Sequence, residues 1–237
     1  MTKDEKSLYT KRSDGRAFDS IREISAKVGV VPNADGSAIF AQGDTIAIAS
    51  VYGPKTHHPK NQQNPEKGVI RVHYGMLSFS VTERIKPGVS RRSQEINQVT
   101  EWALSNVVML EELPGTVIDV HINILQANAG TRCAGINAAA MALAHAGIPM
   151  KEMVSAVAIG KMDKTIVSDV TKEEEDMEEG EGATDIPMAF LSHSEKITLL
   201  QLDGRIQVDR FGEALEAGKK ACKKIFEIQK KALKEAE

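Results

Sequence analysis

The sequence predicts an α+β protein, a single domain of residues 1–237 built from two similar halves, residues 11–147 and 148–237. Three observations lead to this prediction. Groups of strand-like segments precede helix-like segments, and this order occurs twice along the chain. Turn-forming residues bound the short apolar segments of each group. The 237 residues, of which 41% are hydrophobic, can bury a full core.

Four strand-like segments open the first half, and turn-forming residues separate the first three of them. The segments are residues 22–31, 36–42, 44–52 and 68–81. The last is the long stretch "GVIRVHYGMLSFSV". The connection before it, "YGPKTHHPKNQQNPEKG", holds three prolines and little apolar content, which predicts an exposed loop.

Two helices with a strand between them complete the first half. Within residues 89–113 seven apolar residues follow helical spacing: Ile96, Val99, Trp102, Ala103, Leu104, Val107 and Leu110. Residues 116–126 return to a strand pattern. The alanine-rich stretch that follows predicts a helix from Thr131 to Ala146. Because this helix is apolar on nearly every face, we expect it to be buried.

The second half repeats the order of strands before a helix. "VSAVAIGKM" and "KTIVSDV" predict a β-hairpin, and "IPMAFLS" and "KITLLQLDGRI" predict two further strands. The acidic stretch between the two pairs, residues 173–185, is expected to be a solvated loop over most of its length. Asp209 opens an amphipathic helix that runs to the end of the sequence.

Composition excludes several classes of protein. Charged residues fill the opening "MTKDEKSLYTKR", so we expect no signal peptide, and the longest apolar run, Ile136 to Ile148, is too short to cross a bilayer. We therefore expect a soluble, cytoplasmic protein with no membrane partner. Cys133 and Cys222 lie in apolar helical patterns, which favours buried free thiols over a disulfide or a zinc site.

The charge distribution is compatible with a nucleic-acid partner, although the net charge of −3 does not suggest one. Residues 173–185 hold eight carboxylates and no Lys or Arg. The rest of the chain carries 30 basic against 25 acidic residues, a balance of +5. A local acidic patch therefore masks a mildly basic body.

Two predicted helices begin with arginine, where the helix dipole disfavours each cation by roughly 0.3–1 kcal/mol. Arg91 and Arg92 open the first helix, and Arg132 follows Gly130 and Thr131 at the start of the alanine-rich helix. Surface ion pairs of the arginines, or ordinary capping by Thr131, explain each helix start taken singly. Together the two starts predict a phosphate site made of backbone N–H and guanidinium groups.

Asp185 is the acid that we expect beside this phosphate site. It directly precedes the apolar segment "IPMAFL", so we expect it to be fixed at the edge of the fold. A carboxylate fixed near phosphate can act as a general acid or hold a divalent ion. No dedicated metal cage is visible in the sequence, and Mg²⁺ is expected only as an auxiliary cofactor.

Five motifs, in the same order, carry a resemblance to a known family: "RSDGR", "YGPKTHHP", "FSVTERIKPGVSRRSQEI", "LQANAGTRCAGINAAAMALAHAGIPM" and "ITLLQLDG". From about Lys11 to the final helix, the chain resembles catalytic members of the RNase PH family in the archaeal RNA exosome. The resemblance implies the RNase PH fold (ribosomal protein S5 domain 2-like). It also implies a phosphate-dependent 3′→5′ exoribonuclease that uses inorganic phosphate as co-substrate, releases nucleoside diphosphates from single-stranded RNA and can add tails in reverse.

The resemblance also assigns roles to the residues at the two helix starts. The family's phosphate-binding positions correspond to Arg92, Gly130, Thr131 and Arg132. Arg91 corresponds to an arginine that helps to hold the RNA backbone.

Two active-site aspartates of the family lie on either side of a short turn, and the second corresponds to Asp185. The acidic segment of this chain is about three residues longer than is usual in the family. The first aspartate therefore corresponds to Asp176 by local sequence, and to Glu179 by distance from Asp185. We favour Asp176, because extra residues in an exposed turn can loop out without moving its ends.

The family resemblance implies partners as well. We expect a hexameric ring, a trimer of heterodimers in which this chain alternates with an inactive RNase PH-like paralogue, and a cap of RNA-binding S1-domain proteins. Lys55, His58 and Lys60 are expected to bind RNA as exposed cations near the catalytic phosphate site. Two other functions stay open: a catalytically silent scaffold subunit of the same ring, and an RNA-binding module without chemistry.

Overall fold

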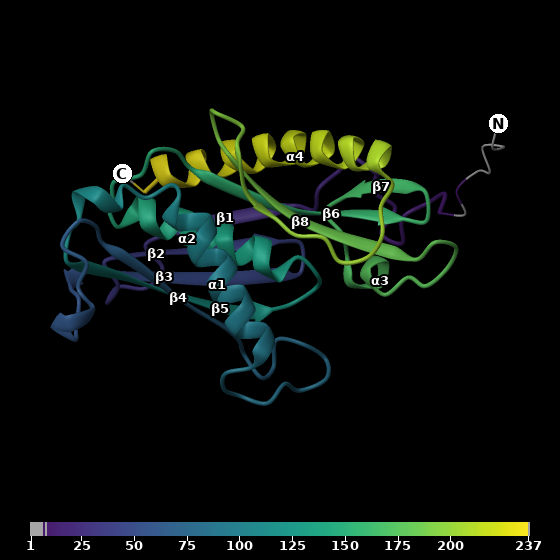
Figure 1. Ribbon diagram of the computed structural model, residues 1–237. Coiled ribbons are helices and arrows are strands. Elements are labelled where there is room, and N and C mark those ends of the chain that lie inside the picture. Colours follow the sequence, from purple (N-terminus) through teal and green to yellow (C-terminus); the bar gives the residue numbers. More distant parts are fainter. Residues whose placement is uncertain (1–6, 8, 237) are drawn as a thin grey trace.

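The computed structural model describes residue 7 and residues 9–236 (Figure 1). The segment for which we expect no signal peptide lies largely outside these residues. The described chain forms two β-sheets and a set of α-helices, and the predicted α+β class is confirmed. None of its helices is long and apolar enough to span a membrane.

The first sheet contains five strands in the order β1-β2-β3-β5-β4. Their bounds are Ile24–Val28 (β1), Gly36–Gln42 (β2), Thr45–Thr56 (β3), Val69–Met76 (β4) and Thr116–Gln126 (β5). Strands β4 and β5 are parallel and are joined through helix α1 (Arg91–Ser105), whereas the other neighbours are antiparallel.

Helix α1 closes the free edge of this sheet with its side chains. The backbone N–H of Val72 on β4 donates to Glu101 at 3.0 Å, and that of Tyr74 donates to Asn97 at 2.6 Å. These bonds satisfy donors that an edge strand would otherwise leave unpaired. They also fix how α1 lies against β4.

The second sheet is antiparallel and has the order β7-β6-β8-β9. Its strands are Val154–Met162 (β6), Thr165–Ser168 (β7), Ala183–Leu191 (β8) and Ile197–Leu200 (β9). A short helix, α3 (Lys172–Glu175), precedes β8. The long helix α4 (Val208–Lys234) packs on β6 and β7 and also on β1 of the first sheet, so it ties the two sheets together (Figure 1).

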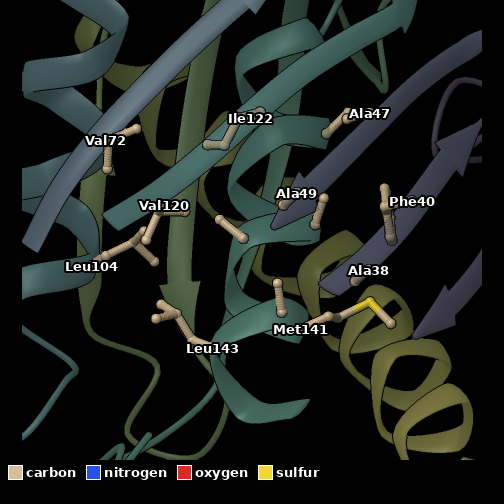
Figure 2. Packing of buried hydrophobic residues seen from close by; sticks show 14 of the residues in the cluster. Ala38, Phe40, Ala47, Ala49, Val72, Leu104, Val120, Ile122, Met141 and Leu143 are labelled. Atoms are coloured by element: carbon tan, nitrogen blue, oxygen red, sulfur yellow. The ribbon is translucent and has the colours of Figure 1, made fainter. Parts of the chain in front are cut away.

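Helix α2 (Thr131–His145) contacts β2, β3 and β5 of the first sheet and β6 and β8 of the second. Its small side chains permit this close approach: a Cβ on Gly36 of β2 would lie only 2.3 Å from the carbonyl oxygen of Ala142. Figure 2 shows Met141 and Leu143 of the helix within the core. Twelve of its fifteen residues are buried, which confirms the predicted burial.

Three predicted elements of the first half are too long. The first strand covers Ile24–Val28 rather than residues 22–31. The fourth strand ends at Met76 rather than at residue 81, because Ser80 turns back to bond with Leu77 (N to O, 2.9 Å). The predicted helix of residues 89–113 ends at Ser105, and Trp102, expected on its apolar face, is 62% exposed. Both cysteines, Cys133 and Cys222, are buried and free as predicted.

Candidate active site

The start of α2 has an unusual backbone conformation. Ala129 and Gly130 both adopt left-handed conformations, with φ of 56° and 63°. The helix begins at Thr131 as predicted, and its N-cap is Gly130, so capping by the Thr131 side chain does not explain this helix start. The first N–H that bonds within the helix is that of Ala134, to the Gly130 oxygen at 3.0 Å. The N–H groups of residues 131–133 precede this bond and form the donor-rich first turn.

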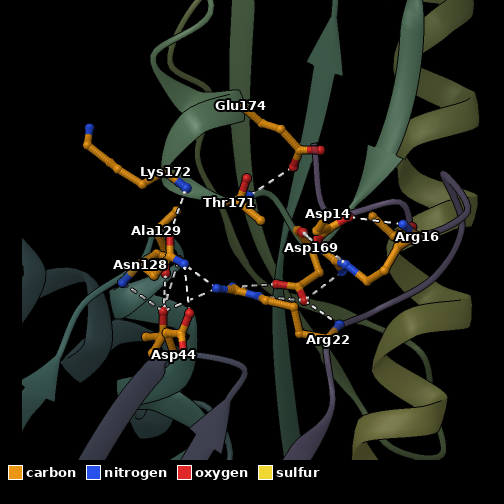
Figure 3. A network of polar contacts seen from close by, with 12 residues as sticks. Asp14, Arg16, Arg22, Asp44, Asn128, Ala129, Asp169, Thr171, Lys172 and Glu174 are labelled. Carbon is orange, nitrogen blue, oxygen red and sulfur yellow. Dashed lines mark hydrogen bonds and ion pairs between the residues drawn. The ribbon is translucent and has the colours of Figure 1, made fainter. Parts of the chain in front are cut away.

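A polar network holds this loop from behind (Figure 3). Thr45 Oγ1 donates to the Ala129 carbonyl at 2.8 Å and accepts from the Asn128 N–H at 3.0 Å. Arg22 donates to the Asn128 carbonyl at 2.6 Å and forms a two-pronged ion pair with Asp169, at 2.6 and 2.9 Å. Because the C=O and N–H of one peptide point in opposite directions, carbonyls bound by this network turn the N–H groups of Ala129 and Gly130 away from it.

The same network connects the loop to the acidic segment. The Asn128 side-chain oxygen accepts the backbone N–H of Lys172, the first residue of α3, at 3.0 Å. Asp169, which pairs with Arg22, lies three residues before Lys172 in the chain. The start of α2 and the start of α3 are therefore held in one rigid frame.

A cleft of about 660 Å³ opens in front of this frame. Arg92 from the first turn of α1, the residues Gly130, Thr131 and Arg132 at the start of α2, and Asp185 from β8 all line it. The five residues predicted to bind phosphate or to act as the acid thus share one cavity.

Arg132 is held inside this cleft by polar neighbours. Its guanidinium hydrogen-bonds to the Gln201 side chain and lies 3.7 Å from the Glu95 carboxylate. Gln201 in turn donates to Glu95 at 2.9 Å. The cation is therefore oriented while a single carboxylate, itself half exposed, balances its charge.

Asp185 is fixed by the strands around it. Strand β8 begins at Ala183, so Asp185 lies within the strand rather than before it. Its backbone N–H and C=O both bond to Asp203, at 2.9 and 2.8 Å. Within the described part of the chain, its Oδ1 is buried and has no hydrogen-bond partner. A buried, unsatisfied carboxylate oxygen at a cleft is suited to hold a proton or to contact a ligand.

The environment of Asp185 changes its acidity. Burial and then the negative charge of Glu175 raise its pKa from 3.8 to about 6, with a smaller contribution from Asp203. The positive charges of Arg132 and Arg92 act in the opposite direction. Asp185 therefore retains a proton much closer to neutral pH than an ordinary aspartic acid does.

The carboxylate that the acidic run of residues 173–181 contributes to the cleft is Glu175, not the expected Asp176. The Asp176 side chain is 62% exposed and pairs with Lys172 at 2.6 Å. Neither Asp176 nor Glu179 lines the cleft, whereas Lys172 and Glu175 of α3 both do. A count along an acidic run cannot reveal which of its carboxylates points inward, because that depends on where α3 is anchored.

The anchor of α3 is Glu174, which was expected in a solvated loop but is buried. Arg12 donates two hydrogen bonds of 2.8 Å to its carboxylate, and the Tyr9 hydroxyl donates one of 2.6 Å. Burial alone would raise the pKa of Glu174, but these hydrogen bonds outweigh it and lower the pKa. A sequence signal for this anchor was present, because Thr171 and Glu174 have the spacing of a capping box, and the backbone N–H of Thr171 donates to the Glu174 carboxylate at 2.9 Å.

The residues predicted to bind RNA lie outside the cleft. Arg91 is exposed at the first position of α1. Lys55, at the end of β3, pairs with Asp119 at 2.5 Å, and His58 and Lys60 are exposed in the following turn. Lys55 lies opposite Val117 at the start of β5, whereas the cleft lies beyond the other end of that strand. The separation is about 30 Å, so the expectation that these cations lie near the phosphate site is wrong.

Metal ligands are sparse in this region. Among the residues that the structure describes, no group of three or more His, Cys, Asp or Glu side chains is arranged to hold a metal ion. An ion at Asp185 would therefore need further oxygen ligands from water or from substrate, which is a common arrangement for Mg²⁺.

Family models match most of the chain. Residues 20–149 match domain 1 of the 3′ exoribonuclease family, RNase PH, and residues 152–221 match domain 2 of that family.

Similar proteins include several exosome components. The chain is 49% identical to the exosome complex component Rrp41 of Thermococcus kodakarensis, over 95% of this chain and 89% of that protein. It is 46% identical to the protein of the same name from Nitrosopumilus maritimus, over 94% of this chain and 90% of that one.

Solved structures show the same fold. Rice Rrp46 superposes with a TM-score of 0.83 at 26% identity, over 94% of this chain and 100% of that one. A chain of the Archaeoglobus fulgidus exosome, solved with RNA bound to its active site, superposes with a TM-score of 0.77 at 24% identity, over 92% of both chains.

Proposed function

The chain belongs to the RNase PH family of 3′ exoribonucleases, and from this premise we propose that it is the catalytic subunit of an exosome. It shortens single-stranded RNA from the 3′ end by phosphorolysis. The observation that carries this proposal is the cleft itself. Two arginines and a donor-rich helix start share it with Asp185, a carboxylic acid whose pKa is about 6.

Each part of the cleft has a role in this reaction. Inorganic phosphate lies against the first turn of α2 and is clamped by Arg92 and Arg132, which offset its charge. One of its oxygens attacks the last phosphodiester of the RNA. The bond from that phosphorus to the 3′ oxygen of the preceding nucleotide breaks, and a nucleoside diphosphate leaves. Positioning and charge stabilisation supply most of the rate enhancement.

Asp185 supplies the proton that the leaving 3′ oxygen requires. Its proton is regained from solvent after each cycle. Because a phosphoester is exchanged for a phosphoanhydride, the reaction is reversible, and nucleoside diphosphates at low phosphate extend RNA. Mg²⁺, held by Asp185 or Glu175 together with phosphate oxygens, would supply additional positive charge to the transferred group.

The assembly proposed for this chain is a hexameric ring in the cytoplasm. The chain alternates there with an inactive RNase PH-like paralogue, and S1-domain proteins cap the ring. Similarity to exosome components over most of the chain supports this assembly. Arg91, Lys55, His58 and Lys60 are proposed to hold the RNA at a distance from the reacting phosphate.

One assay separates the candidate functions. The chain is assembled with its paralogue, and 3′-labelled single-stranded RNA is incubated with and without millimolar phosphate. We expect degradation only with phosphate, and nucleoside diphosphates as the product. Monophosphates, or equal rates without phosphate, would show hydrolysis and refute the proposal. No product from a well-formed ring would identify a scaffold subunit.

A further inference from the structure

Tyr74 is a buried tyrosine on β4 with no assigned role. It is 6% exposed, and within the described part of the chain its hydroxyl makes no hydrogen bond of ordinary length. The Thr131 side chain is the group placed to form one with it. An orphaned hydroxyl in a core costs stability, and a phenylalanine of the same shape would avoid that cost. The hydroxyl therefore calls for an explanation other than packing.

The direction of the Tyr74 ring is fixed. Asn97 holds its backbone N–H, and the ring packs where Gly135 of α2 has no side chain: a Cβ on Gly135 would lie 3.7 Å from a ring carbon. Thr131 precedes Gly135 by four residues and lies on the same face of the helix, one turn nearer its start. The tyrosine is thus directed along α2 toward the phosphate site.

The polar groups around the hydroxyl limit what it can do. They are the Thr131 side chain, the guanidinium groups of Arg92 and Arg132, and the Cys133 thiol, while burial raises the pKa of Tyr74 and keeps it a neutral donor. Guanidinium groups cannot accept hydrogen bonds, and a thiol sulfur is a weak acceptor. Of these four side chains, only that of Thr131 has an oxygen that can accept the Tyr74 proton.

We propose that Tyr74 is a positioning residue of the phosphate site. When phosphate binds, the Tyr74 hydroxyl donates to Thr131 Oγ1, and the Thr131 hydroxyl donates its own proton to a phosphate oxygen. Without the hydrogen bond from Tyr74, the Thr131 hydroxyl can rotate so that its proton points away from the phosphate. The inference rests on the proposed function of the cleft as a phosphate site.

The test compares Tyr74→Phe, Thr131→Val and the double variant in the ring assembled with the paralogue. Tyr52→Phe, a half-buried tyrosine on β3 away from the cleft, is the matched control. We expect Tyr74→Phe to raise the KM for phosphate roughly two- to tenfold, the loss of one hydrogen bond, with the KM for RNA unchanged. Its thermal midpoint should be unchanged or higher, because an unsatisfied hydroxyl is removed.

The double variant tests the mechanism. If Tyr74 acts through Thr131, the double variant is no worse than Thr131→Val alone. Additive effects, an unchanged KM for phosphate, or a lowered midpoint in Tyr74→Phe would each overturn the inference. A wild-type enzyme that does not depend on phosphate would instead overturn the proposed function and this inference with it.

Discussion

At the scale of single residues, the acidity of Asp185 decides whether the cleft can perform acid catalysis. An ordinary aspartate is ionised at neutral pH and has no proton to donate. Burial beside Glu175 raises the pKa of Asp185 to about 6, although two arginines in the same cleft oppose this shift. The protein therefore bears the cost of a poorly solvated carboxylate at the place where a proton donor is needed.

Replacing Asp185 with Asn should abolish RNA degradation and also stabilise the fold above pH 6. The folded-state pKa lies above the unfolded value of 3.8, so the folded chain binds more protons between about pH 4 and 6. The protonated form of Asp185 therefore stabilises the folded state at low pH, and this stabilisation is lost as the pH rises through the window. Asn does not titrate, so the variant does not lose this stabilisation. The free energy of unfolding of Asp185→Asn minus that of wild type should therefore be about 1–3 kcal/mol larger at pH 8 than at pH 4.

Denaturant unfolding of wild type and Asp185→Asn at the two pH values measures this difference. Asp203→Asn is the control, because Asp203 is exposed and contributes only a minor part of the shift. A difference between wild type and Asp185→Asn that does not vary with pH would show that Asp185 has an ordinary acidity. Retained turnover in Asp185→Asn would remove it from the mechanism.

The residues proposed to bind phosphate line one cleft, and they could be selected from the sequence because their signals are local. Arginine at a helix start is unfavourable by itself, so Arg92 and Arg132 pointed to an anion without knowledge of the fold. Tyr74 gave no comparable signal. The capping-box spacing of Thr171 and Glu174 marks a helix start, but it does not reveal that Glu174 is buried against Arg12, 162 positions away.

At the scale of elements, α2 was predicted nearly to the residue, whereas α1 and β4 were predicted too long. The composition of α2 fixes both its helicity and its burial, and Gly147 marks its end. The ends of the other two depend on distant contacts. Strand β4 stops at Met76, and four residues later the Ser80 carbonyl accepts the backbone N–H of Ala127, a residue distant in the sequence, at 2.8 Å.

The orientation of α3 leads to a prediction about its two adjacent carboxylates. Glu175 lines the cleft and raises the pKa of Asp185, whereas Asp176 faces solvent and pairs with Lys172. Glu175→Gln should therefore lower the pKa of Asp185 and shift the alkaline fall of kcat to lower pH. Asp176→Asn removes the same charge one residue away and should leave the profile nearly unchanged.

The pH dependence of kcat from about pH 5 to 8 in wild type and both variants is the measurement. A shift in Asp176→Asn with none in Glu175→Gln would restore the assignment made from sequence alone. A kcat that rises through pH 6 in wild type would show that Asp185 acts in its ionised form, for example as an ion ligand, rather than as an acid.

At the scale of the whole molecule, the first sheet separates two groups of cations. The cleft lies beyond the end of β5, and the turn with Lys55, His58 and Lys60 lies near its start, about 30 Å away. Both groups of cations are visible in the sequence, but the distance between them is not. The pairing of β3 with β5, which places Lys55 opposite Val117, is a tertiary feature.

This separation predicts an effect that depends on the length of the RNA. Lys55→Gln combined with Lys60→Gln should weaken the binding of long RNAs and leave RNAs too short to span about 30 Å unaffected. The plot of log affinity against log salt should become shallower by up to about 1.4 for long RNA, since each neutralised phosphate contact on a single strand contributes about 0.7. The KM for phosphate should not change, because the cleft is untouched.

The matched control is Lys220→Gln with Lys223→Gln on α4, two exposed lysines whose replacement removes the same charge from another surface. Lys223 pairs with Glu195 at 2.5 Å, as Lys55 pairs with Asp119, so each double variant removes one lysine that forms such a pair. If the affinities for long and short RNAs fall equally, or if the α4 variant shows the same salt dependence, the turn contributes only to the overall positive charge of the protein surface. An effect confined to long RNA and to the Lys55 and Lys60 variant would place the turn on the RNA path, one sheet length from the reacting phosphate.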